Sequence, residues 1–182
     1  PLSWPLYKGT EAYRSYEPEH MVPAFLPVTQ SEHQVRLNAS THDKSGILQH
    51  SSPEAMENTA RLERKINQRM KAYEFYELDE QPGAEKLIIA FGITAAAARE
   101  ATSRLRERGE KISLLLPGTL LPLPEIYSEI MASYKRIVIA EETINNQFGT
   151  LVYGSRIPEN VRFAGGLGKM ITPTEIMEEI NA

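Results

Sequence analysis

The chain of 182 residues contains no cysteine. This absence excludes disulfide bonds, a thiolate nucleophile and any iron–sulfur cluster held by cysteines of this chain. It is typical of a cytoplasmic protein, which is the location we expect. No apolar run approaches the ~20 residues that a membrane-spanning helix needs, so we expect no contact with a membrane.

An excess of positive charge is also lacking. The formal net charge is −4, and acidic and basic residues are mixed along the chain. We therefore expect no broad basic face for nucleic acid and no nucleic-acid partner. The opening PLSWPLYKG has no methionine and no signal-like apolar segment, so we interpret the chain as a piece of a longer polypeptide.

Residues 1–52 differ in composition from the rest of the chain. Five of the twelve prolines lie in the first 27 residues, and the apolar periodicity is poor. These features favour an extended arm or linker over a packed domain. The arm is nevertheless too aromatic for plain disorder, and we expect it to lie on another protein surface; its aromatic residues are Trp4, Tyr7, Tyr13, Tyr16 and Phe25.

All four histidines, His20, His33, His42 and His50, also fall in this arm. Their wide, irregular spacing contains no i,i+4 pair, so we predict no metal site. His42 and Asp43 could form a base and its orienting partner, but the turn-forming residues around them favour a solvated turn.

A linker helix is predicted over residues 53–78. Ser52 is a suitable N-cap and Pro53 suits the first helical position. One apolar stripe is formed by Leu62, Ile66, Met70 and Tyr73. The turn-rich residues 79–85 follow, and we predict that a separate α/β domain occupies residues 84–182.

That domain is organised around residues 86–116. Leu87–Phe91 and Ile112–Leu116 are continuous apolar runs, typical of strands covered on both faces. Gly92 allows a sharp turn, Thr94 could cap the intervening helix, and Gly109 could end it. Strand, helix and strand in this order predict a right-handed parallel βαβ unit.

Two further strands are predicted over residues 136–140 and 161–165, separated by short helices. A final helix has the N-cap Thr172, Pro173 at its first position and Glu175 in its first turn. The predicted fold is therefore an α/β three-layer sandwich with a parallel sheet of four to five strands, preceded by an extended arm and a helix.

Candidate chemistry lies in the loops at the carboxyl ends of these strands. Gly92 and Thr94 open a helix whose backbone N–H groups could hold an anion, although the full glycine-rich phosphate pattern is missing. Glu141 and Glu142 end a strand, where a buried carboxylate could act as a general base or contact a cofactor nitrogen. A solvated strand end or a helix cap is the alternative, and we predict no catalytic residue in this chain.

The order of several segments resembles a known family. The segments are, in chain order, FGIT, AAREA, LLLPGTLLPLP, RIVIAEET, FGTL and GGLGKMITPTEI. The order of these segments is similar to that in the alpha subunit of 2-oxoacid:ferredoxin oxidoreductases, in its C-terminal domain, which is like the C-terminal domain of transketolase. The segment THDKSGIL (41–48) is similar to the one that precedes a basic helix in these subunits. The resemblance covers about residues 42–180.

The resemblance implies an enzyme that oxidatively decarboxylates a 2-oxoacid to an acyl-CoA and passes electrons to ferredoxin. Thiamine diphosphate and iron–sulfur clusters belong to the full complex, and none is expected to bind this piece alone. The implied partners are the other domain of the alpha subunit, the beta subunit and, indirectly, ferredoxin; a homodimer is a further option.

The piece should serve assembly and shape the cofactor and coenzyme A region, and it should be inactive alone. The family's acidic-then-glycine signature corresponds loosely to Glu141, Asn145, Asn146 and Gly149, which with Gly92 and Thr94 are the predicted cofactor-proximal residues. The substrate remains open among pyruvate, 2-oxoglutarate and 2-oxoisovalerate. The alternative function is a stand-alone nucleotide- or acyl-phosphate-binding α/β module.

Overall fold

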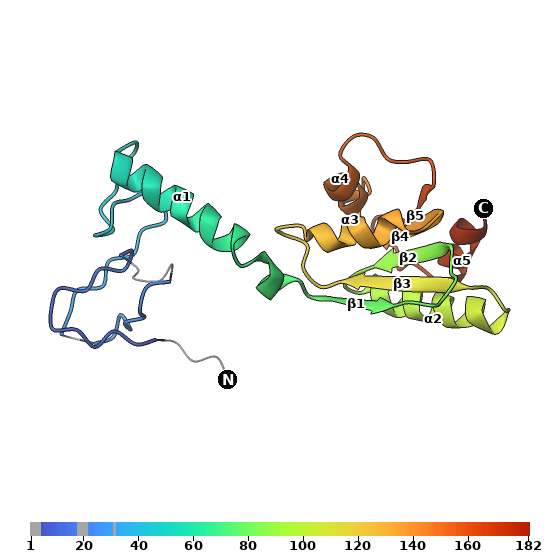
Figure 1. Cartoon of the computed structure of the whole chain (residues 1–182), viewed down its shortest axis with the longest axis horizontal. Coiled ribbons are helices and arrows are strands. Elements are labelled where there is room, and N and C mark those ends of the chain that lie inside the picture. Colours follow the sequence, from blue (N-terminus) through green and yellow to red (C-terminus); the bar gives the residue numbers. More distant parts are fainter. Residues whose placement is uncertain (1–4, 18–21, 31) are drawn as a thin grey trace. The chain divides into compact units, whose positions relative to one another are not determined.

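The computed structural model describes residues 5–17, 22–30 and 32–182, drawn in colour in Figure 1. By its internal contacts the chain divides into two compact units, Pro1–Arg69 and Met70–Ala182. Trp4 and His20, which belong to the predicted arm, lie outside the described residues, as do Pro1 and Pro18. No helix in the described part of the chain is both long and apolar enough to cross a membrane.

In the first unit, the described residues before Ser52 form neither a helix nor a regular strand. Two isolated bridges cross the arm, Leu6 with Phe25 and His42 with Leu48. The ring of Tyr7 lies 5.1 Å from that of Tyr13. Aromatic residues of the arm thus contact one another.

The histidine of the predicted His42–Asp43 pair is buried rather than solvated. Its ring stacks on Tyr16 with the centroids 3.7 Å apart, and it is 7% exposed. The Asp43 carboxylate instead accepts hydrogen bonds from the backbone N–H groups of Ser45 and Ile47. The hydrogen bond from Ile47 is the largest cause that lowers the pKa of Asp43. The Asp43 carboxylate therefore holds a turn and does not orient the ring of His42.

Helix α1 spans Pro53–Asn67 and begins as predicted. The hydroxyl of Ser52 accepts a hydrogen bond of 3.2 Å from the N–H of Ala55, and Pro53 is the first helical residue. The continuous helix predicted to residue 78 is wrong after Asn67, because a 3-10 helix (η1, Met70–Tyr73) and a strand (β1, Tyr76–Asp79) follow. Residues 76–79 form a strand because they pair with a strand that is distant in sequence. The local periodicity of apolar residues does not indicate such pairing.

The second unit contains a five-stranded sheet in the order β1-β3-β2-β4-β5. Strands β2 (Lys86–Ala90), β3 (Ile112–Pro117), β4 (Arg136–Glu141) and β5 (Val161–Gly165) are parallel. The added strand β1 pairs antiparallel with β3. The predicted α/β fold is confirmed, with four parallel strands at the predicted places and one antiparallel edge strand that we did not predict.

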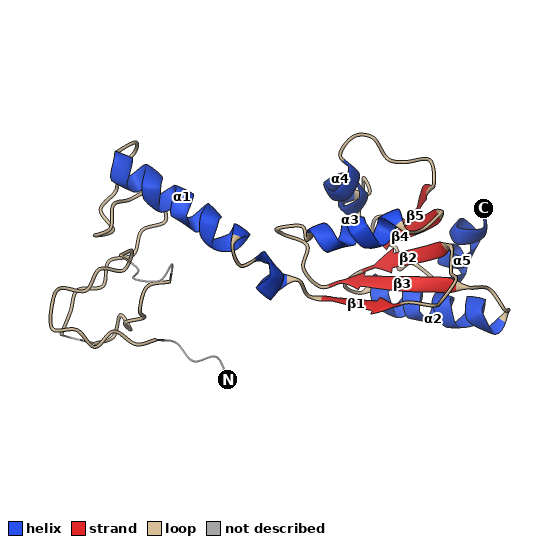
Figure 2. Ribbon diagram, viewed as in Figure 1, coloured by secondary structure: helices blue, strands red, loops and turns tan. Residues whose placement is uncertain are grey.

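Helices cover both faces of this sheet, as Figure 2 shows. Helices α2 (Thr94–Glu107) and α5 (Pro173–Asn181) lie on one face, and α3 (Glu125–Ala132) and α4 (Gln147–Tyr153) lie on the other. Successive residues of β2 supply opposite faces: Ile88 packs in the α2 and α5 core, whereas Leu87 and Ile89 pack in the α3 and α4 core. The strands are continuous apolar runs because both of their faces are buried.

In the second unit, two of the three predicted helix ends are correct. Gly109 adopts a positive φ of 85° directly after the end of α2, and Thr172 and Glu175 form a capping box at the start of α5. Thr94 is not the N-cap of α2. Ile93 holds that position without a side-chain cap, and Thr94 is the first helical residue.

Candidate functional site

The parallel strands end at one edge of the sheet, which we call the carboxyl edge; its strand ends are Ala90, Pro117, Glu141 and Gly165. Gly92 follows β2 with a φ of 58°, a conformation that residues other than glycine rarely adopt. A Cβ at Gly92 would meet no atom within 4 Å. Gly92 is therefore required for its backbone angle, and it stands at the surface.

Thr94 links the turn after β2 to strand β4. Its hydroxyl lies 2.8 Å from the carbonyl oxygen of Phe91 and 3.0 Å from that of Ala140, and it can donate its proton to either. The residue is 4% exposed. Thr94 thus fixes the β2–α2 turn against β4, and its hydroxyl points into the protein rather than toward a ligand.

The carboxylate of Glu141 is buried at the end of β4, where the side chain is 1% exposed. One oxygen accepts hydrogen bonds of 2.9 Å from the hydroxyl of Thr143 and from the backbone N–H of Phe148. The other oxygen accepts a longer bond of 3.4 Å from the N–H of Gly149. Glu141 therefore caps the start of α4, which is the structural alternative that the sequence left open, while Glu142 is half-buried.

Asn145 and Asn146 lie in the loop that Glu141 holds. Asn146 is the N-cap residue of α4, adopts a left-handed conformation with a φ of 50°, and makes no side-chain capping bond. Asn145 is exposed. Asparagine tolerates this backbone region better than most residues, so the loop is a tight turn with amide groups near its surface.

Gly149 is a packing position. A Cβ at this residue would lie 2.4 Å from a ring atom of Phe163, which comes from β5. Of the six predicted cofactor-proximal residues, the structure joins Glu141 to Gly149 by a hydrogen bond and ties Thr94 to the same strand β4. Gly92 and the two asparagines lie in the loops that follow β2 and β4 at the same edge.

Exposed apolar side chains occur in the loops at this edge, a feature that our sequence analysis missed. Six large side chains of the second unit are each 63–76% exposed, and they form what we call the carboxyl-edge rim: Phe75, Ile93, Leu121, Ile144, Leu167 and Met170. Five of them follow the parallel strands β2, β3, β4 or β5 in the chain. The signal available in the sequence is a large apolar residue in each strand-end loop.

Phe75 reaches the same edge because β1 is antiparallel. Its neighbour Tyr76 is in register with Pro117, the last residue of β3. The carbonyl oxygen of Phe75 accepts hydrogen bonds from the N–H groups of Gly118 and Thr119, at 2.7 and 3.0 Å. It also accepts one of 3.0 Å from the hydroxyl of the buried Tyr127, whose pKa is raised by burial. The start of β1 is thus fastened beside the end of β3.

The sequence model of one family matches this second unit. The family is "Pyruvate:ferredoxin oxidoreductase core domain II", and the match covers residues 84–176. The chain belongs to this family. Membership confirms the resemblance to the 2-oxoacid:ferredoxin oxidoreductases, and the matched segment contains the carboxyl edge except for Phe75.

Solved structures agree with the fold of this oxidoreductase domain. A 2-oxoglutarate:ferredoxin oxidoreductase from Magnetococcus marinus, solved with 2-oxoglutarate, coenzyme A and succinyl-CoA bound, is 23% identical with a TM-score of 0.77. The match covers 95% of this chain and 31% of that one, so the chain spans about a third of the relative's length.

Two further solved structures match part of this chain. An inactive split-gene transketolase tetramer is 20% identical with a TM-score of 0.48, over 59% of this chain and 40% of that one. The alpha chain of a probable 2-oxoacid ferredoxin oxidoreductase from Thermoplasma acidophilum is 18% identical with a TM-score of 0.33, over 57% and 90% of the two chains. Among curated proteins, none matches this sequence.

Proposed function

We propose that this chain is the C-terminal domain, with its preceding linker, of the alpha subunit of a thiamine-diphosphate-dependent 2-oxoacid:ferredoxin oxidoreductase. The observation that carries the proposal is the family match over residues 84–176. The full enzyme would convert a 2-oxoacid and coenzyme A to an acyl-CoA, with ferredoxin as the electron acceptor. In that enzyme this domain serves assembly and shapes the cofactor and coenzyme A region.

Inactivity of the isolated domain is supported by the hydrogen bonds of its buried polar groups. The carboxylate of Glu141 accepts from three donors that belong to its own loop and helix. The Thr94 hydroxyl faces two backbone carbonyls. Because both groups are used inside the fold, we assign them to positioning the strand-end loops rather than to a reaction step.

Thiamine diphosphate is usually held through a metal ion that binds its diphosphate, and such ions prefer oxygen ligands. Within residues 5–17, 22–30 and 32–182, no three His, Asp or Glu side chains are grouped so that they could hold a metal ion. In our proposal the metal-bound diphosphate is held by the other domains and subunits. In our proposal Gly92, Asn145 and Asn146 form surface next to it, supported from within by Thr94, Glu141 and Gly149.

The role in assembly is supported by the carboxyl-edge rim. Exposed apolar surface commonly marks a protein–protein interface, and the six rim residues all follow or precede strands at one edge. We propose that the rim packs against the other domain of the alpha subunit or against the beta subunit. Burial of these side chains would stabilise the complex by roughly 1.5–3 kcal/mol for each one that becomes fully buried.

Two measurements on the isolated chain test this function. We expect titration calorimetry with thiamine diphosphate and Mg²⁺, and separately with coenzyme A, to show no binding in the micromolar range. Tight binding of either ligand would contradict a domain that is inactive alone. Tight binding of ATP or an acyl phosphate would instead support the alternative of a stand-alone nucleotide or acyl-phosphate module.

Reconstitution tests the enzymatic assignment. The chain, joined to the remaining domains and subunits of its enzyme, should support coenzyme-A-dependent reduction of ferredoxin by one of pyruvate, 2-oxoglutarate or 2-oxoisovalerate. The matched control is the same preparation without this chain, which should be inactive. Equal activity with and without the chain would contradict the assembly role.

A further inference from the structure

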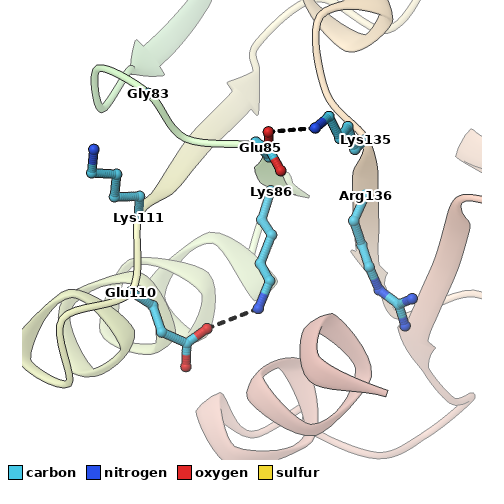
Figure 3. Close-up of a pocket in the computed structure, with 7 residues that line it drawn as sticks. All are labelled: Gly83, Glu85, Lys86, Glu110, Lys111, Lys135 and Arg136. Atoms are coloured by element: carbon cyan, nitrogen blue, oxygen red, sulfur yellow. Dashed lines mark hydrogen bonds and ion pairs between the residues drawn. The ribbon is translucent and has the colours of Figure 1, made fainter.

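A hollow of about 380 Å³ lies at the opposite edge of the sheet, where β2, β3 and β4 begin, and Figure 3 shows it in close-up. We call it the amino-edge pocket. Its charged lining residues come from the starts of these three strands and from the segments just before them: Glu85, Lys86, Glu110, Lys111, Lys135 and Arg136.

Register explains why these side chains meet. Lys86 is the first residue of β2 and is paired in register with Arg136, the first residue of β4. On its other side Lys86 is in register with Ile112, the first residue of β3, so that Lys111 immediately precedes this row. Three neighbouring strands thus begin with a basic residue at or beside their first position, and parallel pairing places these residues along one edge.

Two of the four cations are compensated by carboxylates of the same pocket. The ammonium of Lys86 lies 2.9 Å from Glu110, and that of Lys135 lies 2.5 Å from Glu85. Lys86 also contacts the side chain of Asn181 in α5, and its hydrogen bond lowers the pKa of Glu110. These two ion pairs join the segments at this edge of the sheet, and the contact with Asn181 joins the edge to α5.

The other two cations, Lys111 and Arg136, have no carboxylate partner among the described residues. One terminal nitrogen of Arg136 donates to the carbonyl oxygen of Glu179 at 3.3 Å, while its Nε is buried without a hydrogen-bond partner. Lys111 is exposed. The pocket therefore holds four cations and two carboxylates, in a chain whose net charge is −4. This local excess of positive charge favours a negatively charged partner.

The directions of the two cations indicate what kind of partner fits. In Figure 3 the side chains of Lys111 and Arg136 extend from the pocket to opposite sides. This arrangement favours an extended partner over one small anion such as a phosphate group. An extended polypeptide with several carboxylates could contact both cations and the pocket between them.

We propose that the amino-edge pocket is a docking surface for an acidic segment of a partner protein. The pocket lies at the sheet edge opposite the carboxyl-edge rim, and this proposal does not depend on the identity of the full enzyme. Docking at one edge would leave the loops at the other edge free to face the remaining domains.

Binding of a fluorescein-labelled octaglutamate peptide to the full 182-residue chain, followed by fluorescence anisotropy at low ionic strength, tests the proposal. We expect binding that weakens as salt is added, and a loss of about fivefold in affinity in the double variant Lys111→Gln/Arg136→Gln. The control Arg104→Gln/Arg162→Gln removes the same charge at exposed positions outside the pocket. We expect the control to retain nearly all of the affinity.

The single variant Lys111→Glu is a second test in case the double variant misfolds, because Lys111 is exposed and its replacement leaves the core intact. It should weaken peptide binding at least as much as the double variant, with an unchanged melting temperature. Equal losses of peptide affinity in the pocket and control variants would overturn the proposal. The peptide would then be attracted by the positive charges of the whole surface and not by the pocket. Displacement of the peptide by stoichiometric pyrophosphate would also overturn it, because it would indicate a small-anion site.

Discussion

The buried carboxylate of Glu141 accepts a 2.9 Å hydrogen bond from the backbone N–H of Phe148, across six intervening residues. The first N–H groups of a helix have no partner within the helix, and an acidic side chain is favourable there. Through this bond the end of β4 sets the position of α4 and of the loop that carries Asn145 and Asn146. The geometry of the candidate site thus depends on a side chain that solvent does not reach.

Replacement of Glu141 by alanine should destabilise the domain by about 1–3 kcal/mol, because the buried N–H of Phe148 would lose its partner. Chemical denaturation of the isolated chain measures this free energy of unfolding. Glu142→Ala is the matched control, and it should change the free energy of unfolding by less than about 0.5 kcal/mol since Glu142 is half-buried and not engaged by α4. Equal losses in both variants would contradict the capping role of Glu141.

Gly149→Ala should destabilise the domain by about 1–3 kcal/mol, because the added methyl would overlap the ring of Phe163. Gly166→Ala should have a small effect, since a Cβ at Gly166 meets no atom within 4 Å. Adding Phe163→Leu to Gly149→Ala should restore part of the loss by making room. Absence of coupling between these two changes in a double-mutant cycle would argue against the predicted contact.

Charge introduced into the carboxyl-edge rim should impair assembly without unfolding the domain. Ile93→Asp and Leu167→Asp replace side chains that are each 66% exposed, so the melting temperature of the isolated chain should stay unchanged. Copurification with the remaining parts of the enzyme should fall, because an aspartate buried in an apolar interface would be unpaired. Ile157→Asp, a change at an exposed apolar position outside the rim, should copurify as the wild type does.

A fall in pH should destabilise the first turn of α5. A hydrogen bond from Lys169, together with the capping bonds of Thr172, lowers the pKa of Glu175 from 4.5 to about 2. Since the folded state holds the carboxylate ionised, this contribution is fully present above about pH 4.5 and is lost as the pH falls toward 2. Melting curves measured across this range should show a smaller decline in Glu175→Gln than in the wild type.

Glu178→Gln is the control variant, because it makes the same change at an exposed position of the same helix. Its stability should decline between pH 4.5 and 2 as much as that of the wild type. The same decline in Glu175→Gln as in the wild type would show that other carboxylates cause it.

The central strands and most helix ends could be predicted from local sequence. Leu87 to Ala90 and Ile137 to Ala140 are continuous apolar runs because both faces of their strands are covered. Thr172, Pro173 and Glu175 specify the start of α5 through contacts within four residues of one another. The cap at Thr94 was predicted wrongly because the carbonyl of Ala140, which its hydroxyl faces, is distant in sequence.

By itself the sequence determined the parallel α/β core, the capping box of α5 and the family resemblance, since these follow from the order and spacing of neighbouring residues. Only the tertiary structure decided that residues 76–79 form an antiparallel edge strand, that Glu141 is buried against α4, and that cations at or just before the starts of three strands line one pocket. The physical reason is that strand register and burial are long-range relations, and no local pattern of residues records them.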